Sequence, residues 1–495
     1  MKRNINTSHS LQKNINTIQK SFHFNKELII RVIGIPLKEE KKLRELAIVY
    51  LDTIVEKEAI QDHIIKPLLQ KTCISFTQPI EELMNTVEIS DVKVISSYNE
   101  VINGLVNGKT ILLVDGCNYC IVADTSDWKD RSFAPPQSQR VLKGPQIGFT
   151  ELAKNNISLI KRSLKNSNLV IEEQTIGKET NTSVSIVYLV DRVDKEILKE
   201  LKKRIDDIEL EAILDSSYIE ESISKVQKTT FPTVLVTERP DVTVAHILEG
   251  KIGIVCDGSS NILIVPALFI QFLQSPEDYY EKPLLEWTRL LRIFSFIISI
   301  YLIPLYVAFT LFHQEMIPSE LLINLAAQRQ VVPLPVVVEV LVFMLVFQIV
   351  LEGSIRLPTG ITLAFSIIGT IIFGQSASQA GLVQLATLVV VSITYILNFA
   401  VPVQPLANSV KTIRYIFLFL ADIYGFYGIM LGTIGLIIHL CSLKSFGVPY
   451  LSPITPMKTV DLKDTFIRMS LDKIVNNPKK YSKVSNEDQN NKMDE

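Results

Sequence analysis

This 495-residue sequence has few cysteines, few histidines and a net charge close to zero, and each of these features argues against a class of protein. The five cysteines are too few for the disulfide framework of a secreted domain and suit a reducing compartment. The six histidines share no spacing that suits a metal site. The net charge of −2 gives no overall attraction to nucleic acid. We therefore expect no metal site and no nucleic-acid partner.

A long apolar segment is missing from the first half of the chain. Before Leu290 the longest nearly unbroken apolar stretch is Ile262 to Leu273, which is too short to span a bilayer. The first residues, Met1-Lys2-Arg3-Asn4, are followed by polar residues and not by the apolar core of a secretory signal. We therefore predict a soluble, cytoplasmic N-terminal half that precedes a membrane domain.

The soluble half mixes helical and β-type patterns, which predicts an α/β fold. Leu43, Leu46, Tyr50 and Ile54 recur at three- and four-residue steps and predict an amphipathic helix. Asp194 is a candidate N-cap for a second helix that runs to about residue 208. Short runs typical of strands lie between the helical patterns at Ile111 to Val114 and Val184 to Tyr188.

An internal repeat divides the soluble half. The sequence GKTILLVDG at residues 108–116 recurs as GKIGIVCDG at residues 250–258, each after an apolar helical stretch and before a β-type run. This pattern predicts a helix, a glycine cap, a strand, an Asp-Gly turn and a strand, used twice. Gly144-Pro145 marks the boundary between subdomains at residues 26–145 and 146–285. Residues 1–25 have so few apolar side chains that we expect a flexible arm there.

The second half predicts an α-helical membrane domain at residues 286–445, followed by a tail at residues 446–495. Four spans are expected at residues 290–312, 331–351, 361–380 and 382–401. The next segment, Ile413 to Leu443, is too long for one crossing and short for two. Because the lysine-rich tail is expected inside, either this segment is a hairpin or the third span is re-entrant. The domain therefore has about five or six membrane segments.

Two motifs that suggest chemistry lack the context that the chemistry needs. Gly108-Lys109-Thr110 resembles part of a phosphate-binding loop, but it follows a helix and precedes a strand, which reverses the order of that loop. Cys117 and Cys120 have redox or zinc spacing without a second ligand pair nearby, so we interpret them as part of an exposed hairpin turn. The sequence shows no catalytic constellation, and we expect neither an enzyme nor a cofactor.

Polar residues inside the predicted spans are the candidates for an ion path, because such residues are costly in lipid. Glu339 and Gln348 lie in the second span, on opposite faces of an ideal helix, and an interfacial, solvated position is the alternative for Glu339. Gln375, Ser378 and Gln379 share one helix face in a segment of small and polar residues. That segment spans residues 374–381. It either lines or gates the path, or its small residues pack against a neighbouring helix.

Ordered blocks of residues in both halves point to a known family. Those in the soluble half are Ser158 to Arg162, Asn168 to Val170, Thr175 to Lys178, Ile213 to Ser216, Thr237 to Asp241 and Ser275 to Glu281. Those in the membrane half are Phe312 to Pro318, Ile355 to Pro358, Gly374-Gln375, Ala380 to Val383 and Ser445 to Leu451. In these blocks the chain resembles the A subunit of the GerA family of bacterial spore germinant receptors.

The resemblance implies a subunit of a nutrient receptor in the inner membrane of dormant spores. It also implies a transporter-like B subunit and a lipoprotein C subunit as partners, and a ring-shaped homo-oligomer that acts as a nutrient-gated channel for monovalent cations. Met344, Gln348 and Gln379 stand where acidic residues are common in the family. The alternatives are a stage V sporulation paralogue of the same fold, a transporter that binds its own substrate, and a membrane-tethered enzyme. A transporter predicts paired, inverted hydropathy halves, which the sequence does not show.

Overall fold

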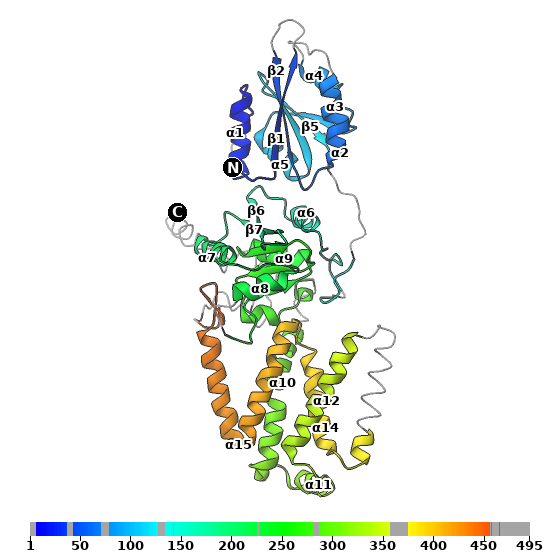
Figure 1. Cartoon of the computed structure of the whole chain (residues 1–495), viewed down its shortest axis with the longest axis vertical. Coiled ribbons are helices and arrows are strands. Elements are labelled where there is room, and N and C mark those ends of the chain that lie inside the picture. Colours follow the sequence, from blue (N-terminus) through cyan, green and yellow to red (C-terminus); the bar gives the residue numbers. More distant parts are fainter. Residues whose placement is uncertain are drawn as a thin grey trace. The chain divides into compact units, whose positions relative to one another are not determined.

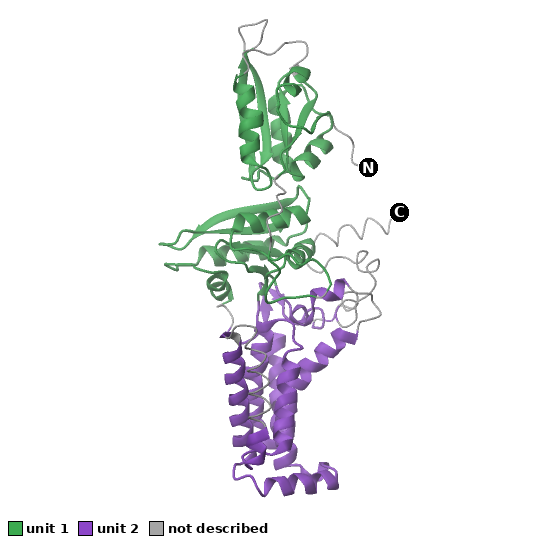
Figure 2. Cartoon of the chain, turned by 90° about the vertical axis from the view of Figure 1, so that its right-hand side faces the viewer, with its two compact units in different colours: residues 1–226, 234–266, 478–495 green, residues 227–233, 267–477 purple. Residues whose placement is uncertain are grey.

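The chain folds into two compact units, each with its own arrangement of helices or sheets (Figures 1 and 2). The computed structural model describes residues 6–36, 43–70, 79–126, 134–141, 143–224, 228–280, 287–356, 375–455, 457 and 465. Unit 1 comprises residues 1–226, 234–266 and 478–495, and unit 2 comprises residues 227–233 and 267–477.

Unit 1 begins with a five-stranded antiparallel sheet that has helices on both faces. Its strands, in spatial order, are β1 (Leu28–Pro36), β2 (Leu43–Leu51), β4 (Lys109–Val114), β5 (Cys120–Asp124) and β3 (Val92–Ile95). One face packs against α1 (Leu11–Ser21) and α5 (Tyr98–Val106). The other face packs against α2 (Lys57–Ile60), η1 (Gln61–Ile65), α3 (Lys66–Gln70) and α4 (Pro79–Met84).

The helix predicted from Leu43 to Ile54 is wrong, because most of this segment forms β2. Leu46 and Ile48 enter the core on one face of the sheet, and Ala47 and Val49 enter the core on the other. Apolar residues are therefore needed at every position, and the two-residue alternation that identifies a half-buried strand disappears.

A second sheet of the same design follows in unit 1. Its strands, in spatial order, are β6 (Leu169–Ile176), β7 (Thr182–Leu189), β9 (Ile252–Cys256), β10 (Ile262–Val265) and β8 (Leu235–Thr237). Its helices are α6 (Ala153–Ser163), α7 (Lys195–Asp206), α8 (Ser216–Ser224) and α9 (Pro240–Leu248). The predicted cap of α7 is confirmed, since the Asp194 carboxylate accepts a hydrogen bond from the Glu196 backbone N–H at 2.9 Å.

The predicted repeat of helix, glycine, strand, Asp-Gly turn and strand is confirmed in both sheets. The first copy runs through α5, Gly108, β4 and β5, and the second runs through α9, Gly250, β9 and β10. Gly108 and Gly250 have φ values of 79° and 90°, a left-handed conformation that suits glycine after a helix. Each lies 142 positions from its counterpart, and the same offset relates α1 to α6.

The flexible arm expected at residues 1–25 is wrong for residues 11–21, because they form α1. Its apolar residues follow a helical stripe and enter the core of the first sheet: Leu11, Ile15, Ile18 and Phe22. The Asp115 carboxylate accepts the Leu11 N–H at 3.1 Å, just as Asp257 accepts the Ala153 N–H at 2.9 Å. α1 is thus the first-copy counterpart of α6, and the repeat is longer than the matching hairpins.

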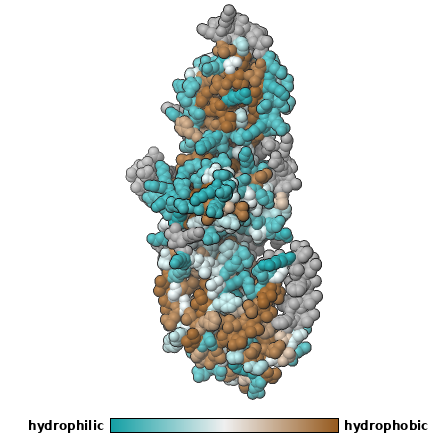
Figure 3. Space-filling model, viewed as in Figure 1, coloured by the Kyte–Doolittle hydropathy of each residue, from teal (hydrophilic) through white to brown (hydrophobic). Residues whose placement is uncertain are grey.

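Unit 2 is a helical bundle with an apolar surface. Its main helices are α10 (Trp287–Leu311), α11 (Ser319–Arg329), α12 (Val336–Arg356), α14 (Leu385–Asn398) and α15 (Gln404–Ser442). α10, α12 and α15 are long and apolar enough to cross a membrane, and α14 is apolar but shorter. Hydrophobic side chains gather over the surface of these helices (Figure 3). Most of the expected third span lies outside the described residues, so the count of five or six segments stays a prediction.

The long α15 reverses direction at Gly425, where φ is 58°. A Cβ atom on Gly428 would lie 2.0 Å from the Leu420 carbonyl oxygen, and one on Gly432 would lie 2.9 Å from Leu420 Cδ1. In a straight helix, residues 420 and 432 would be about 18 Å apart. The segment is therefore a helical hairpin, which was one of the two alternatives left open by its length.

A small clasp of residues 443–450 follows α15. It contains the two-residue strands β11 (Lys444–Ser445) and β12 (Val448–Pro449). The Ser445 hydroxyl donates to the Thr233 carbonyl at 2.8 Å and accepts the Ala267 N–H at 3.0 Å. The fully buried Tyr450 ring packs against Phe231, Phe269 and Phe272. The clasp therefore joins the end of α15 to the segments that precede α10. Those segments include η2 (Phe269–Leu273) and η3 (Pro276–Tyr279).

Candidate functional site

A buried carboxylate lies at the start of α12. The apolar residues of this helix that face the bundle, including Val336, Val340 and Met344, recur at four-residue steps. Glu339 falls within this stripe and is only 1% exposed. Its Oε1 accepts the backbone N–H of Gln384 at 2.5 Å, and no residue in the described part of the chain bonds its Oε2. The Glu339 side chain is therefore not solvated, and its depth relative to the membrane stays a prediction.

Three more oxygen-bearing side chains form a hydrogen-bonded group next to this carboxylate. The Tyr306 hydroxyl of α10 lies 3.2 Å from Gln384 Oε1 and 2.9 Å from Thr387 Oγ1. The Thr387 hydroxyl also lies beside Glu339. Gln384 and Thr387 are buried at the N-terminus of α14, where the first backbone N–H groups attract negative charge. Helices α10, α12 and α14 thus bring Tyr306, Glu339, Gln384 and Thr387 into one polar cluster, named the Glu339 cluster below.

The other predicted pore residues lie outside the Glu339 cluster. Gln348 is half-buried further along α12. Gln375 and Gln379 are exposed, and Ser378 is half-buried, in a helical turn at residues 375–379. Within the described residues no hydrogen bond joins any of these side chains to Glu339, and Gly374 lies outside that part of the chain. Their role in an ion path stays a prediction.

A fully buried arginine lies in the same bundle, at a position that the sequence does not mark as a candidate. Arg414 of α15 is fully buried, donates from Nε to the Ser299 carbonyl at 2.7 Å, and lies over the Tyr395 ring at 5.5 Å. Its Nη2 has no hydrogen-bond partner and no carboxylate lies within 4 Å, among the residues that the structure places. Its positive charge opposes the passage of cations close to it.

An ion-pair cluster fastens α10 to the segment before it. Asp278 of η3 accepts hydrogen bonds from Arg289 at 3.2 Å and from Arg292 at 2.7 Å. Burial by itself would raise the pKa of Asp278, but the two guanidinium groups outweigh burial and hold that pKa below its usual value. Asp278 is therefore a charged anchor for the start of the first apolar helix.

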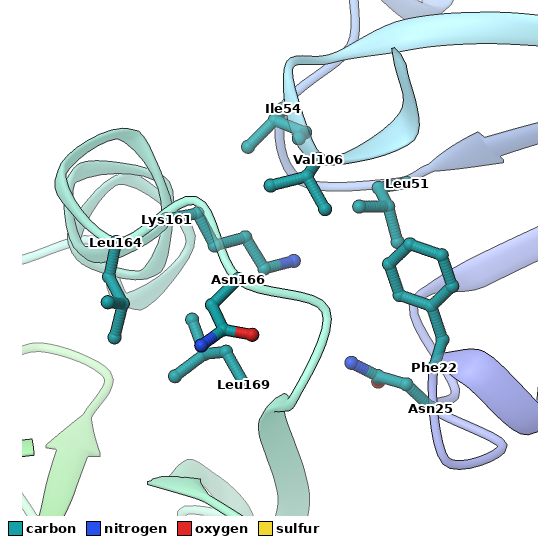
Figure 4. A pocket seen from close by; sticks show the side chains of 9 residues that line it. All are labelled: Phe22, Asn25, Leu51, Ile54, Val106, Lys161, Leu164, Asn166 and Leu169. Carbon is teal, nitrogen blue, oxygen red and sulfur yellow. The ribbon is translucent and has the colours of Figure 1, made fainter. Parts of the chain in front are cut away.

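Unit 1 contains a small cavity where the two repeat copies meet (Figure 4). Its wall is mainly apolar and includes Phe22, Leu51 and Leu169. Lys161 of α6 points into it, and its Nζ donates to Glu27 Oε2 at 2.5 Å and to Thr53 Oγ1 at 2.6 Å. Burial lowers the pKa of Lys161, and the Glu27 carboxylate opposes that shift. The ammonium is already paired, so this cavity offers a ligand little free polar capacity.

The sequences and structures of known proteins show what this chain is similar to. Residues 16–480 match the family described as Bacillus/Clostridium GerA spore germination protein. Spore germination protein KA of Bacillus subtilis is 40% identical over 464 residues, which cover 93% of this chain and 85% of that protein. Spore germination protein GerLA of Bacillus cereus is 32% identical over 425 residues, or 86% of each chain. The crystal structure of the N-terminal domain of the A subunit of the Bacillus megaterium spore germinant receptor GerK3 is 28% identical. It covers 54% of this chain and 99% of its own, with a TM-score of 0.42.

Proposed function

The chain belongs to the Bacillus/Clostridium GerA family of spore germination proteins, and from this premise we propose that it is the A subunit of a nutrient germinant receptor. The observation that carries the proposal is the family match over residues 16–480, which takes in both repeat copies of unit 1 and the helical bundle of unit 2. A match of that extent supports the function of a whole subunit and not of a shared module alone.

The proposed location is the spore inner membrane, with unit 1 in the cytoplasm. The long apolar helices α10, α12 and α15 and the exposed apolar side chains of unit 2 support the membrane part. Unit 1 holds two sheets with buried cores of its own, which suits an aqueous compartment. The proposed partners are a transporter-like B subunit, a lipoprotein C subunit and further copies of this chain.

The proposed activity is the nutrient-gated passage of monovalent cations, and the Glu339 cluster supports it. A carboxylate buried in an apolar bundle is expensive, and such groups tend to mark ion pathways. The charge of Arg414 disfavours a cation path through its part of the same bundle. The path is therefore proposed to include the Glu339 cluster, at the start of α12 and α14, and to avoid the part of α14 that lies beside Arg414. A nutrient bound elsewhere in the receptor would open the path by binding the open arrangement more tightly.

Deletion of the gene, followed by germination assays with single nutrients, tests the proposal. A receptor subunit predicts normal spores that fail to release cations in response to one class of nutrient and respond normally to others. A defect in spore formation would favour the stage V sporulation paralogue. Normal germination and cation release with every nutrient, in a strain without other receptors of this family, would contradict the proposed function.

A further inference from the structure

We propose that the Glu339 cluster binds a single monovalent cation inside the helical bundle. Its ligands would be the Glu339 carboxylate, the side-chain oxygen of Gln384, and the hydroxyls of Thr387 and Tyr306. Binding itself follows from the chemistry of these four side chains. The use of the site in ion passage rests on the proposed function.

The charge of the cluster calls for one positive charge. A buried carboxylate is destabilised unless it is paired or hydrogen-bonded on both oxygens. Glu339 Oε1 accepts the Gln384 N–H at the start of α14, which offsets part of the cost. Oε2 has no bonding partner in the described part of the chain. A monovalent cation at Oε2 would make the cluster neutral, whereas a divalent cation would leave a buried positive charge.

The ligand chemistry also fits a hard cation. All four side chains offer oxygen, the donor that hard cations such as alkali metal ions prefer, and the cluster has no sulfur or imidazole. Tyr306 has one hydroxyl proton for two neighbours, Gln384 Oε1 and Thr387 Oγ1. At least one of these oxygens therefore keeps lone pairs for an ion. Because the residues come from three packed helices, a bound ion would also hold those helices together.

The positively charged side chain of Arg329 lies close enough to influence the charge of the site. The charge of Arg329, the exposed last residue of α11, reaches Glu339, but the two do not form an ion pair within 4 Å. Its positive charge weakens the attraction of the carboxylate for a metal cation. Removing it should therefore strengthen binding, which a purely structural role for Glu339 would not predict.

Thermal unfolding of the purified full-length chain in detergent tests the site. The melting temperature is measured in sodium, potassium, magnesium and choline chloride at equal ionic strength, since an ion that binds the folded state raises it. We expect a higher melting temperature in sodium or potassium than in choline, lost in Glu339→Gln and kept in Glu352→Gln. Glu352 is the matched control, because it lies on the same helix with its side chain 58% exposed. Equal melting temperatures in alkali and choline salts would show that no alkali cation binds the folded chain, and would overturn the proposal.

Conservative variants decide the matter if Glu339→Gln does not fold. Thr387→Val and Tyr306→Phe each remove one oxygen and keep the shape of the side chain. Each should raise the half-maximal sodium or potassium concentration about tenfold, the equivalent of about 1.4 kcal/mol. Arg329→Gln should lower that concentration. Unchanged titrations in all three variants would overturn the proposal. Cation-dependent melting in a chain whose deletion leaves germination normal would reject the proposed function while leaving the site intact.

Discussion

The contribution of α1 to the first repeat copy can be measured with a matched pair of substitutions. Ile18 of α1 and Ile160 of α6 are equivalent across the 142-residue offset, and both are fully buried. Replacing a buried isoleucine with alanine costs about 2–5 kcal/mol, from lost apolar transfer and from the cavity left behind. Asn16 lies on the exposed face of α1, and Asn16→Ala should change the stability by no more than about 0.5 kcal/mol.

Urea denaturation of a fragment spanning residues 6–266, followed by circular dichroism, provides the measurement. With a slope of about 1–3 kcal/mol per molar urea, Ile18→Ala and Ile160→Ala should each lower a transition midpoint by about 1–3 M. A fragment that starts at residue 26 should lose the first copy altogether. It lacks four core side chains worth about 6–12 kcal/mol, which is comparable to the stability of a whole domain.

If Ile160→Ala lowers a midpoint while Ile18→Ala behaves like Asn16→Ala, residues 11–21 do not pack on the sheet. The same conclusion would follow from rapid hydrogen exchange throughout α1 in the full-length chain, because a packed helix protects its amides.

Three further predictions concern unit 2 and the topology. Gly425→Ala should reduce the amount of the chain in the membrane fraction, because Gly425 has a positive φ and a Cβ there would lie 2.9 Å from the Phe312 ring. Gly435→Ala is the control and should leave that amount unchanged, because no atom lies within 4 Å of its Cβ. Immunoblots of the membrane fraction compare the two variants. Asp278→Asn should cost about 3–5 kcal/mol by removing the carboxylate that pairs with the buried Arg289 and with Arg292. Because folding lowers the pKa of Asp278, its contribution to the folding stability is complete above about pH 4 and is lost as the pH falls through the lowered pKa. The melting temperature of Asp278→Asn should therefore lack this dependence on acid pH. A cysteine at the exposed Tyr119 should react with a membrane-impermeant reagent only after the membrane is broken, and labelling of intact protoplasts would reject a cytoplasmic unit 1.

The repeated hairpins could be predicted from sequence because glycine and Asp-Gly turns leave a local signal. The rest of the repeat was harder to detect, since α1 is stabilised by contacts made far along the chain. Asn14 illustrates this: it is polar yet buried, with hydrogen bonds to both backbone groups of Ser8 and to the Tyr98 hydroxyl. Polar residues such as Asn14 led to the prediction that residues 1–25 form a flexible arm. The signal that could have corrected the interpretation is Asn156, whose side chain bonds Thr150 in the same way.

Of the residues in the Glu339 cluster, only Glu339 itself could be identified from the sequence. Glu339 could be identified because an acid inside an apolar span is unusual. Its partners could not, because Gln384 is 45 positions away, Tyr306 precedes both, and hydroxyl and amide residues at the ends of spans are common. Which of them meet depends on how α10, α12 and α14 pack. Arg414 was missed for a related reason, since a basic residue near the end of a span suggests an interfacial position and not a buried one.

The clasp at residues 443–450 has a mechanical consequence. It joins the end of α15 to the segments that lead into α10, so α10 and α15 share one attachment point. A displacement of the segment that leads into α10 is therefore transmitted both to the start of α10 and to the end of α15. α12 and α14 have no such fastening among the described residues. The Glu339 cluster lies where α12 and α14 meet α10, one of the two helices that the clasp joins.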